Sequence, residues 1–158
     1  MSSLDKQPLE QAVDLFAAGW RAPQPHAWDR LMADDVELEQ PLLRNGRGIA
    51  LWHDEVRRLL QLLPDLEGEV LDWAGRGDSL FIRLRLTASA AGKPVIFEAV
   101  DHLILNEDGL VTRRVSSFDP LPMSLLLLRR PRIWLRWWRS GVGPWTGRRR
   151  FVTNRGAR

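Results

Sequence analysis

Asp101 is the residue whose surroundings in this sequence most clearly suggest chemistry. It lies in a stretch, 95–105, whose alternate positions on the same side are apolar: Val95, Phe97, Ala99, Leu103 and Leu105. Because successive side chains of a strand point to opposite faces, its carboxyl group should enter the core or a cavity. Such a group suits general acid/base catalysis or hydrogen-bond donation. Alternatively, a neighbouring side chain or water satisfies Asp101, and the residue only holds the fold.

A second group of residues suits the binding of an apolar ligand. Gln40 shares a face with Val36 and Leu38 at the end of a predicted strand, 36–40, so its amide could orient a ligand or bond to local backbone. Aromatic walls are predicted from these side chains: Phe16, Trp20, Trp28, Trp52, Trp73 and Phe97. Aromatic residues at helical spacing also serve as ordinary core, so both interpretations stay open.

The sequence favours neither a metal site nor a nucleotide site. The three histidines, His26, His53 and His102, are not spaced as metal ligands, and the chain has no cysteine. His102 is predicted on the face opposite Asp101, which argues against a dyad of the two. Segments 46–48 and 75–77 are glycine turns rather than phosphate loops. No metal and no cofactor are therefore expected.

Clear helical periodicity appears in two places ahead of residue 66. Leu9, Val13, Phe16 and Trp20 form one face of a first helix, which Gly19 and the proline segment 23–25 should end. A short helix is predicted at 26–32, and a further amphipathic helix runs from Ile49 to Leu63, where Pro64 stops it.

Period-two patterns separated by turns predict four further strands, 66–76, 80–87, 95–105 and 110–118. Consecutive hairpins imply an antiparallel meander, with the helices packed on one face. The predicted fold class is α+β, a curved antiparallel sheet wrapped around N-terminal helices as a cone with an open mouth.

Charge divides the chain into two parts. Residues 1–122 hold 13 Lys/Arg and 20 Asp/Glu, a net charge of −7, whereas residues 123–158 hold ten Arg and no acid. We therefore expect a domain at 1–120 and a basic Trp/Arg tail at 121–158. Short helices should start near Pro122 and Pro131, and residues 140–158 should be irregular.

Three interpretations of the tail follow from its composition. Its Leu and Trp residues pack on the domain as a lid, or the segment 123–139 binds an anionic membrane surface. Nucleic acid is the third and least favoured partner. The N-terminal residues lack an apolar signal-peptide core, and the longest apolar run, Leu125–Leu128, cannot span a bilayer. A cytoplasmic protein, peripheral at a membrane if the tail binds one, is expected.

The order of these elements resembles the nuclear transport factor 2-like superfamily, particularly its SnoaL-like branch. The segment from Ala99 to Val111 carries the strongest match, and Asp34 to Pro41 carries a weaker one. The resemblance covers about residues 8–120 and implies a conical α+β barrel with a deep pocket, often dimeric. It is weakly specific for function, because the fold hosts many activities.

The resemblance also narrows the mechanism. In ketosteroid isomerases of this superfamily the position matching Asp101 is an acid that donates a hydrogen bond, but their base matches Gln40, and this chain has no tyrosine. Epoxide hydrolases need two Asp and an Arg in the pocket, and Arg83 and Arg85 are predicted on the opposite face. Cyclase-like members need little more than one acid/base, which Asp101 could supply.

Two functions are therefore open. The chain acts on a small apolar molecule, polyketide-, steroid- or lipid-like, by cyclase, isomerase or dehydratase chemistry without a metal, or it binds such a molecule without catalysis. A homodimer is a further expectation of the resemblance.

Overall fold

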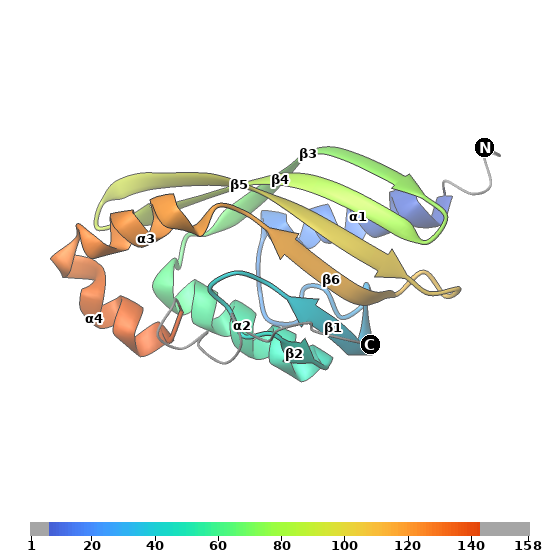
Figure 1. Cartoon of the computed structure of the whole chain (residues 1–158), viewed down its shortest axis with the longest axis horizontal. Coiled ribbons are helices and arrows are strands. Elements are labelled where there is room, and N and C mark those ends of the chain that lie inside the picture. Colours follow the sequence, from blue (N-terminus) through green and yellow to red (C-terminus); the bar gives the residue numbers. More distant parts are fainter. Residues whose placement is uncertain (1–6, 143–158) are drawn as a thin grey trace, which may run out of the picture.

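A six-stranded sheet forms the body of the molecule in the computed structural model, which describes residues 7–142 (Figure 1). The elements in chain order are α1 Gln7–Arg21, β1 Met32–Glu39, β2 Gly46–Arg47, α2 Ile49–Leu62, β3 Glu67–Arg76, β4 Ser79–Ala90, β5 Lys93–Leu105, β6 Val111–Ser117, α3 Pro120–Leu128 and α4 Pro131–Ser140. The fold class is α+β, as predicted.

The sheet has the strand order β2-β1-β6-β5-β4-β3. The meander β3 to β6 is antiparallel throughout, which confirms the hairpin prediction. However, β1 pairs with β6 in parallel, so the sheet is mixed rather than wholly antiparallel. The reason is connectivity: β1 and β6 are not joined by a hairpin, because α2 and four strands intervene.

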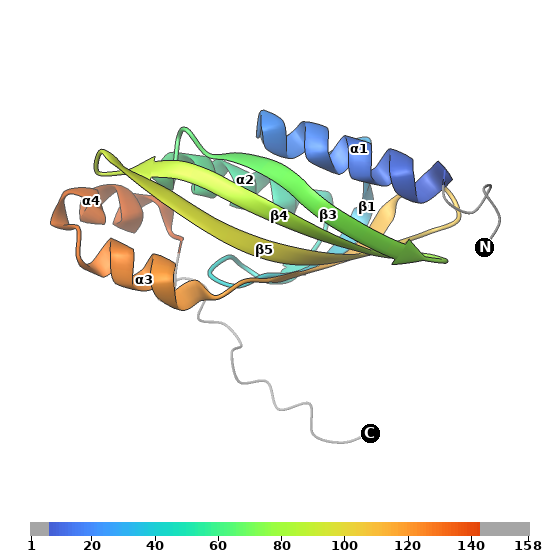
Figure 2. The same ribbon diagram turned by 90° about the horizontal axis from the view of Figure 1, so that it is seen from above.

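Helices α1 and α2 lie on one side of the curved sheet, and α1 runs along β3 (Figures 1 and 2). The face of α1 predicted from sequence is the buried one: Leu9, Ala12, Val13, Phe16, Gly19 and Trp20. The core therefore fills the space between the two helices and the inner face of the sheet.

The short helix predicted at 26–32 is wrong. The segment forms successive turns, with hydrogen bonds such as Ala27 N–H to Gln24 O and Asp29 N–H to His26 O, and β1 begins already at Met32. Trp28 and Leu31 are buried, as the pattern suggested. The turns alone therefore direct both side chains into the core, and no helix is needed.

Gly19 does not end α1, which continues to Arg21. A Cβ atom at this position would lie 2.3 Å from the indole Nε1 of Trp28, so the glycine allows the ring to lie directly against the helix. Gly19, predicted from the sequence to end the helix, instead allows close packing against Trp28.

The described part of the tail forms the two predicted helices and packs on the domain. Leu127 and Ile133 are buried in the same core as the N-terminal helices, and α4 contacts α2. Arg130 donates a hydrogen bond to the carbonyl of Ala90, so the junction of α3 and α4 is tied to the end of the β4–β5 hairpin (Figure 2). The prediction of irregular structure beyond Val142 lies outside the described residues.

Within residues 7–142, no helix is both long enough and apolar enough to cross a bilayer.

Candidate functional site

Strand β5 carries Asp101 into the interior, as its alternation predicted. The residues of its inner face are buried except for Phe97, which is half-buried, and Asp101 has no exposed surface at all. In the β5–β6 register Asp101 lies opposite Ser116 and diagonal to Arg114. Diagonal neighbours on one face of a sheet are within reach of a long side chain. The register therefore brings a guanidinium to the buried carboxylate.

Arg114 pairs with Asp101 through two nitrogens. Its Nε lies 2.9 Å and its Nη2 2.8 Å from Asp101 Oδ2, and both side chains are buried. The guanidinium carbon also lies 4.6 Å from the ring centre of Trp52, a cation–π arrangement. Asp101 is thus a paired carboxylate rather than an isolated buried acid. The guanidinium that pairs with it also packs on the ring of Trp52.

Gln40 completes the polar side of the site. Its Oε1 accepts a hydrogen bond of 2.7 Å from Arg114 Nη1, while its Nε2 donates to the carbonyl of Arg44 at 3.3 Å. These two bonds orient the amide, since each is possible with only one assignment of O and N. Gln40 thus lines the cavity and also bonds to local backbone, while the orientation of a ligand by its amide stays a prediction.

The loop after β1 is anchored so that Gln40 stays in place. Asn45 Oδ1 accepts the Gln40 backbone N–H at 2.7 Å, and the buried Glu55 of α2 accepts from both the backbone and the side chain of Arg44. Leu42, in the middle of this loop, is buried at a φ of 64°. A left-handed leucine costs free energy that the surrounding contacts must offset.

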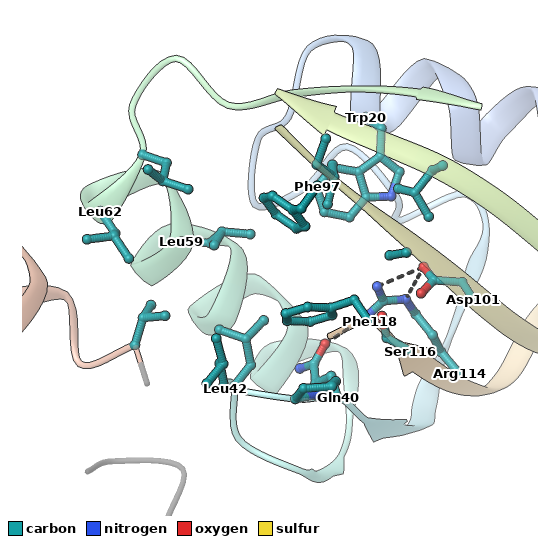
Figure 3. Close-up of a pocket in the computed structure, with 17 residues that line it drawn as sticks. Trp20, Gln40, Leu42, Leu59, Leu62, Phe97, Asp101, Arg114, Ser116 and Phe118 are labelled. Carbon is teal, nitrogen blue, oxygen red and sulfur yellow. Dashed lines mark hydrogen bonds and ion pairs between the residues drawn. The ribbon is translucent and has the colours of Figure 1, made fainter. Parts of the chain in front are cut away.

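A cavity of about 50 Å³ opens beside the Asp101–Arg114 pair (Figure 3). Besides Gln40, Asp101, Arg114 and Ser116, its wall is apolar: Trp20, Pro41, Leu42, Leu43, Leu59, Leu62, Leu63, Leu84, Leu86, Phe97, Ala99, Phe118 and Val142. A mostly apolar lining with a few polar groups at one corner is the usual composition of a small-molecule pocket.

Val142 brings the C-terminal region into this wall. Helix α4 ends at Ser140, and the left-handed φ of 70° at the following Gly141 turns the chain. Trp137 Nε1 donates a hydrogen bond of 2.6 Å to the carbonyl of Val142. The start of the chain beyond α4 therefore helps to close the cavity.

Two polar atoms of the wall have no hydrogen-bond partner within residues 7–142. They are Asp101 Oδ1, an acceptor, and Trp20 Nε1, a donor. Buried polar groups are nearly always satisfied, so an orphan acceptor and an orphan donor on one cavity invite a ligand that supplies both.

The aromatic residues predicted to contact a ligand fall into two groups. Trp20 and Phe97 line the cavity. Phe16, Trp28 and Trp52 lie in the core outside its lining, and Trp73 is partly buried against that core; Trp20, Trp28 and Trp52 pack edge to face with one another. The structure thus brings Trp20, Gln40, Phe97 and Asp101 together and leaves the other four outside the cavity lining.

Sequence reasoning missed Arg114. It tested Arg83 and Arg85, which do face outward and pair with Glu98. The pocket therefore does hold an arginine beside Asp101, and the other side-chain partner of this arginine is the Gln40 amide rather than a second aspartate. The register of β6 against β5 turns Arg114 toward Asp101, and no local sequence pattern shows that register.

Two of the three histidines, which the sequence does not space as metal ligands, come together in the structure. His26 and His53 have ring centres 4.1 Å apart, and Asp29 bridges them. Burial tends to raise the pKa of the Asp29 carboxyl, but hydrogen bonds from His53 and His26 lower it below its ordinary value. His102 lies elsewhere, stacked on Phe81 and 2.8 Å from Ser79 Oγ.

A family model for the SnoaL-like domain matches residues 13–114, well over half of the chain. The chain belongs to the SnoaL-like domain family. The match contains β1, α2, β5 and the residues of the polar corner, Gln40, Asp101 and Arg114. Among curated proteins, none matches this SnoaL-like chain.

Solved structures place the SnoaL-like chain in the nuclear transport factor 2-like fold. A protein named as a SnoaL-like polyketide cyclase from Jannaschia sp. CCS1 is 21% identical, with a TM-score of 0.71 over 83% of this chain and 98% of that one. A protein named as a polyketide cyclase from Bacillus cereus ATCC 10987 is 19% identical, with a TM-score of 0.68 over 79% and 83%. TerC, co-crystallised with polyporic acid, is 19% identical, with a TM-score of 0.67 over 76% and 98%.

Proposed function

We propose that this SnoaL-like protein binds a small apolar carbonyl compound, polyketide-, steroid- or lipid-like, and that Asp101 exchanges a proton with it. The supporting observation is the Asp101 carboxylate: Asp101 lines the cavity, its Oδ2 is paired with Arg114, and its buried Oδ1 has no hydrogen-bond partner among the described residues. A base needs one free lone pair at a fixed position, and this arrangement supplies it.

The proposed reaction begins with a proton transfer from the ligand to Asp101. Asp101 Oδ1 takes a proton from the carbon next to the ligand carbonyl, and the electron pair of the broken C–H bond forms an enolate. Contacts to Asp101 and Gln40 engage three of the five guanidinium N–H groups of Arg114, so up to two can stabilise the enolate oxygen. Return of the proton to another carbon isomerises the ligand. Attack of the enolate carbon on a second carbonyl of the ligand instead closes a ring, and the alkoxide oxygen formed takes the proton back from Asp101.

The relatives support the class of ligand. Two similar structures are named as polyketide cyclases, and TerC was crystallised with polyporic acid. For this chain the apolar wall with one polar corner favours a compound of the same kind, a mostly hydrophobic ring system with a carbonyl or enol oxygen. Trp20 and Phe97 are the aromatic contacts we propose for the ring, and Gln40 positions Arg114.

Ligand entry requires movement at the mouth of the cavity. A volume of about 50 Å³ is several times smaller than the roughly 300 Å³ at which ligand pockets begin. Leu42, on the strained loop after β1, and Val142, on the turn after α4, both line the cavity. We propose that these two segments swing outward when the ligand enters.

An exchange experiment tests the catalytic proposal. The probe is 2-tetralone in D₂O, and proton NMR follows deuterium uptake next to its carbonyl. The wild-type chain should accelerate uptake, and Asp101→Asn should lower the protein-dependent rate by about a hundredfold or more while 2-tetralone still quenches tryptophan fluorescence. Equal exchange rates for wild type and D101N would refute the proposal.

The alternative function is binding without catalysis. It is favoured by Gln40, an amide at the place where isomerases of this superfamily have a base, and by the many tryptophans of the core. Under this alternative, native mass spectrometry of the purified chain detects a bound small molecule that is unchanged after long incubation. D101N would then bind 2-tetralone without any difference in exchange rate.

Helix α4 supports a second role, attachment to an anionic membrane surface. Trp138 is 87% exposed and Leu135 67% exposed, and Trp134 lies half in solvent beside them. Arg132, Arg136 and Arg139 are exposed on the neighbouring face. Aromatic and aliphatic side chains flanked by arginine suit the headgroup region of an anionic bilayer.

Removal of the whole tail is a poor test, because Leu127, Ile133 and Val142 are core residues. The sharper variant is Leu135→Ser with Trp138→Ser, which leaves those contacts intact. Wild type should sediment with vesicles containing phosphatidylserine and remain in the supernatant with phosphatidylcholine alone, and the double variant should remain in the supernatant with both. Equal sedimentation of the two proteins would exclude α4 as the attachment site.

A further inference from the structure

His26, Asp29 and His53 form a compact cluster on the surface, separate from the cavity described above. Asp29 Oδ2 lies 2.9 Å from His26 Nδ1, and Asp29 Oδ1 lies 2.6 Å from His53 Nε2. One atom from each of the three residues can be chosen so that all lie within 4.8 Å of one another. Two imidazole nitrogens and one carboxylate oxygen are therefore aimed at one small volume.

We infer that this cluster is a binding site for a borderline transition-metal dication such as Zn²⁺ or Co²⁺. Imidazole and carboxylate are the ligands these ions take in the absence of thiolates, and the chain contains no cysteine. Hard ions such as Mg²⁺ and Ca²⁺ prefer all-oxygen sites, so two histidines argue against them. Three protein ligands on an open surface leave at least one position for water.

The cluster needs only small movements to accept the ion. Ligand atoms held about 2.1 Å from a tetrahedral metal are about 3.4 Å from one another. The three chosen atoms lie within 4.8 Å of one another, so no pair has to approach by more than about 1.4 Å. The His26 and Asp29 side chains are 68% and 42% exposed, so both are free to adjust. His53 is only 15% exposed and supplies a fixed ligand.

The backbone on both sides of the cluster is held by buried tryptophans. Trp28 precedes Asp29, Trp52 precedes His53, and the two rings, each 1% exposed, pack edge to face 5.1 Å apart. The turn segment 25–31 and helix α2 are thereby fixed against each other. A metal on the outside of this contact would join the same two segments a second time.

Cobalt absorbance and tryptophan fluorescence test the site directly. The full chain is freed of metal with a chelator and titrated with Co²⁺, then with Zn²⁺ in competition. We expect one equivalent of Co²⁺ to give visible ligand-field bands and to quench tryptophan fluorescence, because Trp28 and Trp52 adjoin two of the ligands. A hundredfold excess of Zn²⁺ over its Kd should raise Tm by about 5–10 °C.

Three variants assign the ligands, and a fourth serves as the control. His26→Gln, Asp29→Asn and His53→Gln should each weaken Co²⁺ binding at least tenfold, while His102→Gln, which removes the histidine outside the cluster, should leave it unchanged. The His26 side chain is mostly exposed, so its variant will fold, and circular dichroism without metal checks the others. Absence of one-equivalent binding, or equal affinity in H26Q, H53Q and H102Q, would overturn the inference.

Discussion

The polar corner of the pocket depends on a single buried ion pair. Removal of one partner of such a pair leaves an uncompensated charge and costs about 3–5 kcal/mol, whereas replacement of both by apolar residues is often neutral. Asp101 and Arg114 are both buried, so the full effect applies to them. The pair therefore matters more for the position of the carboxylate than for net stability.

We predict that Arg114→Met lowers the free energy of unfolding by about 3–5 kcal/mol, and that Asp101→Leu in addition restores most of it. Urea unfolding monitored by tryptophan fluorescence measures both. Arg113→Met is the matched control, since Arg113 pairs with Glu39 at the surface and such pairs contribute about 0–1 kcal/mol. Similar losses for R113M and R114M would mean that the ion pair is not desolvated as described.

Sequence alone located Asp101 and could not locate Arg114. Alternation along β5 is regular, so parity assigned the faces correctly. In β6 the register shifts between the pairs of Ile104 and Leu105, so Val111 and Arg114 both point inward. Strict alternation from Val111 would select Arg113, which instead binds Glu39 on the outside. A bulge is set by the pairing of two strands and leaves no clear local signal.

At the scale of elements, the contact of α1 with the turn segment 25–31 depends on Gly19. Helix propensity favours alanine over glycine by about 1 kcal/mol. However, the added Cβ would lie 2.3 Å from Trp28 Nε1, and overpacking costs typically 1–3 kcal/mol. The steric effect should exceed the gain in propensity, because backbone and a buried indole cannot easily separate.

Gly19→Ala is accordingly expected to lower Tm by several degrees. In a Trp28→Leu background the same change should be neutral or stabilising, because the ring that clashes is gone. Differential scanning calorimetry of the four proteins measures the coupling. Equal effects of G19A in both backgrounds would show that the glycine serves α1 alone.

The junction between α2 and β3 carries a pH-dependent contact. Asp65 Oδ1 accepts the Ser89 backbone N–H at 3.0 Å, and this hydrogen bond is the main reason that the pKa of Asp65 lies below its ordinary value. A lowered pKa in the folded state means that the contact stabilises the fold above the unfolded-state pKa, about 4, and is lost as pH falls through the folded value.

We therefore expect Asp65→Asn to be less stable than wild type at neutral pH, and the difference to shrink as pH falls below about 4. Urea unfolding of both proteins across this range tests the sign. A difference that stays constant or grows toward acid pH would show that the carboxylate form of Asp65 does not stabilise the fold.

The order of the elements was largely predictable from the sequence. The features that were not predictable are contacts between segments far apart in the chain. The helix faces and the meander follow from local periodicity. The parallel pairing of β1 with β6, and the approach of His26 to His53, join segments that no local pattern connects. Arg114 meets Gln40 for the same reason, because Leu38 pairs with Arg114 across that parallel contact.

At the scale of the whole molecule, the outer face of β4 and β5 stays open among the described residues. Phe81, Ile96 and Val100 are 47%, 64% and 41% exposed, and they flank the Arg83–Glu98–Arg85 ion pairs. An apolar patch with a charged centre suits a self-complementary contact between two copies. We expect the chain to dimerise through this face.

Val100→Glu should convert the dimer to a monomer, because it replaces one of the apolar side chains that flank the charged centre with a further charge. Sedimentation equilibrium measures the mass of both proteins, and Thr112→Glu, on the neighbouring strand, is the control that should remain dimeric. A wild-type chain that is monomeric at every concentration would contradict the proposed contact.

A crystal structure of the chain with 2-tetralone would show whether a small apolar carbonyl compound enters the cavity and contacts Asp101. We predict ligand density between Trp20 and Phe97, with its carbonyl oxygen at hydrogen-bond distance from Arg114 and its adjacent carbon facing Asp101 Oδ1. We also predict that Leu42 and Val142 move away from the cavity. Density at another site, with the cavity unchanged and empty, would contradict the account.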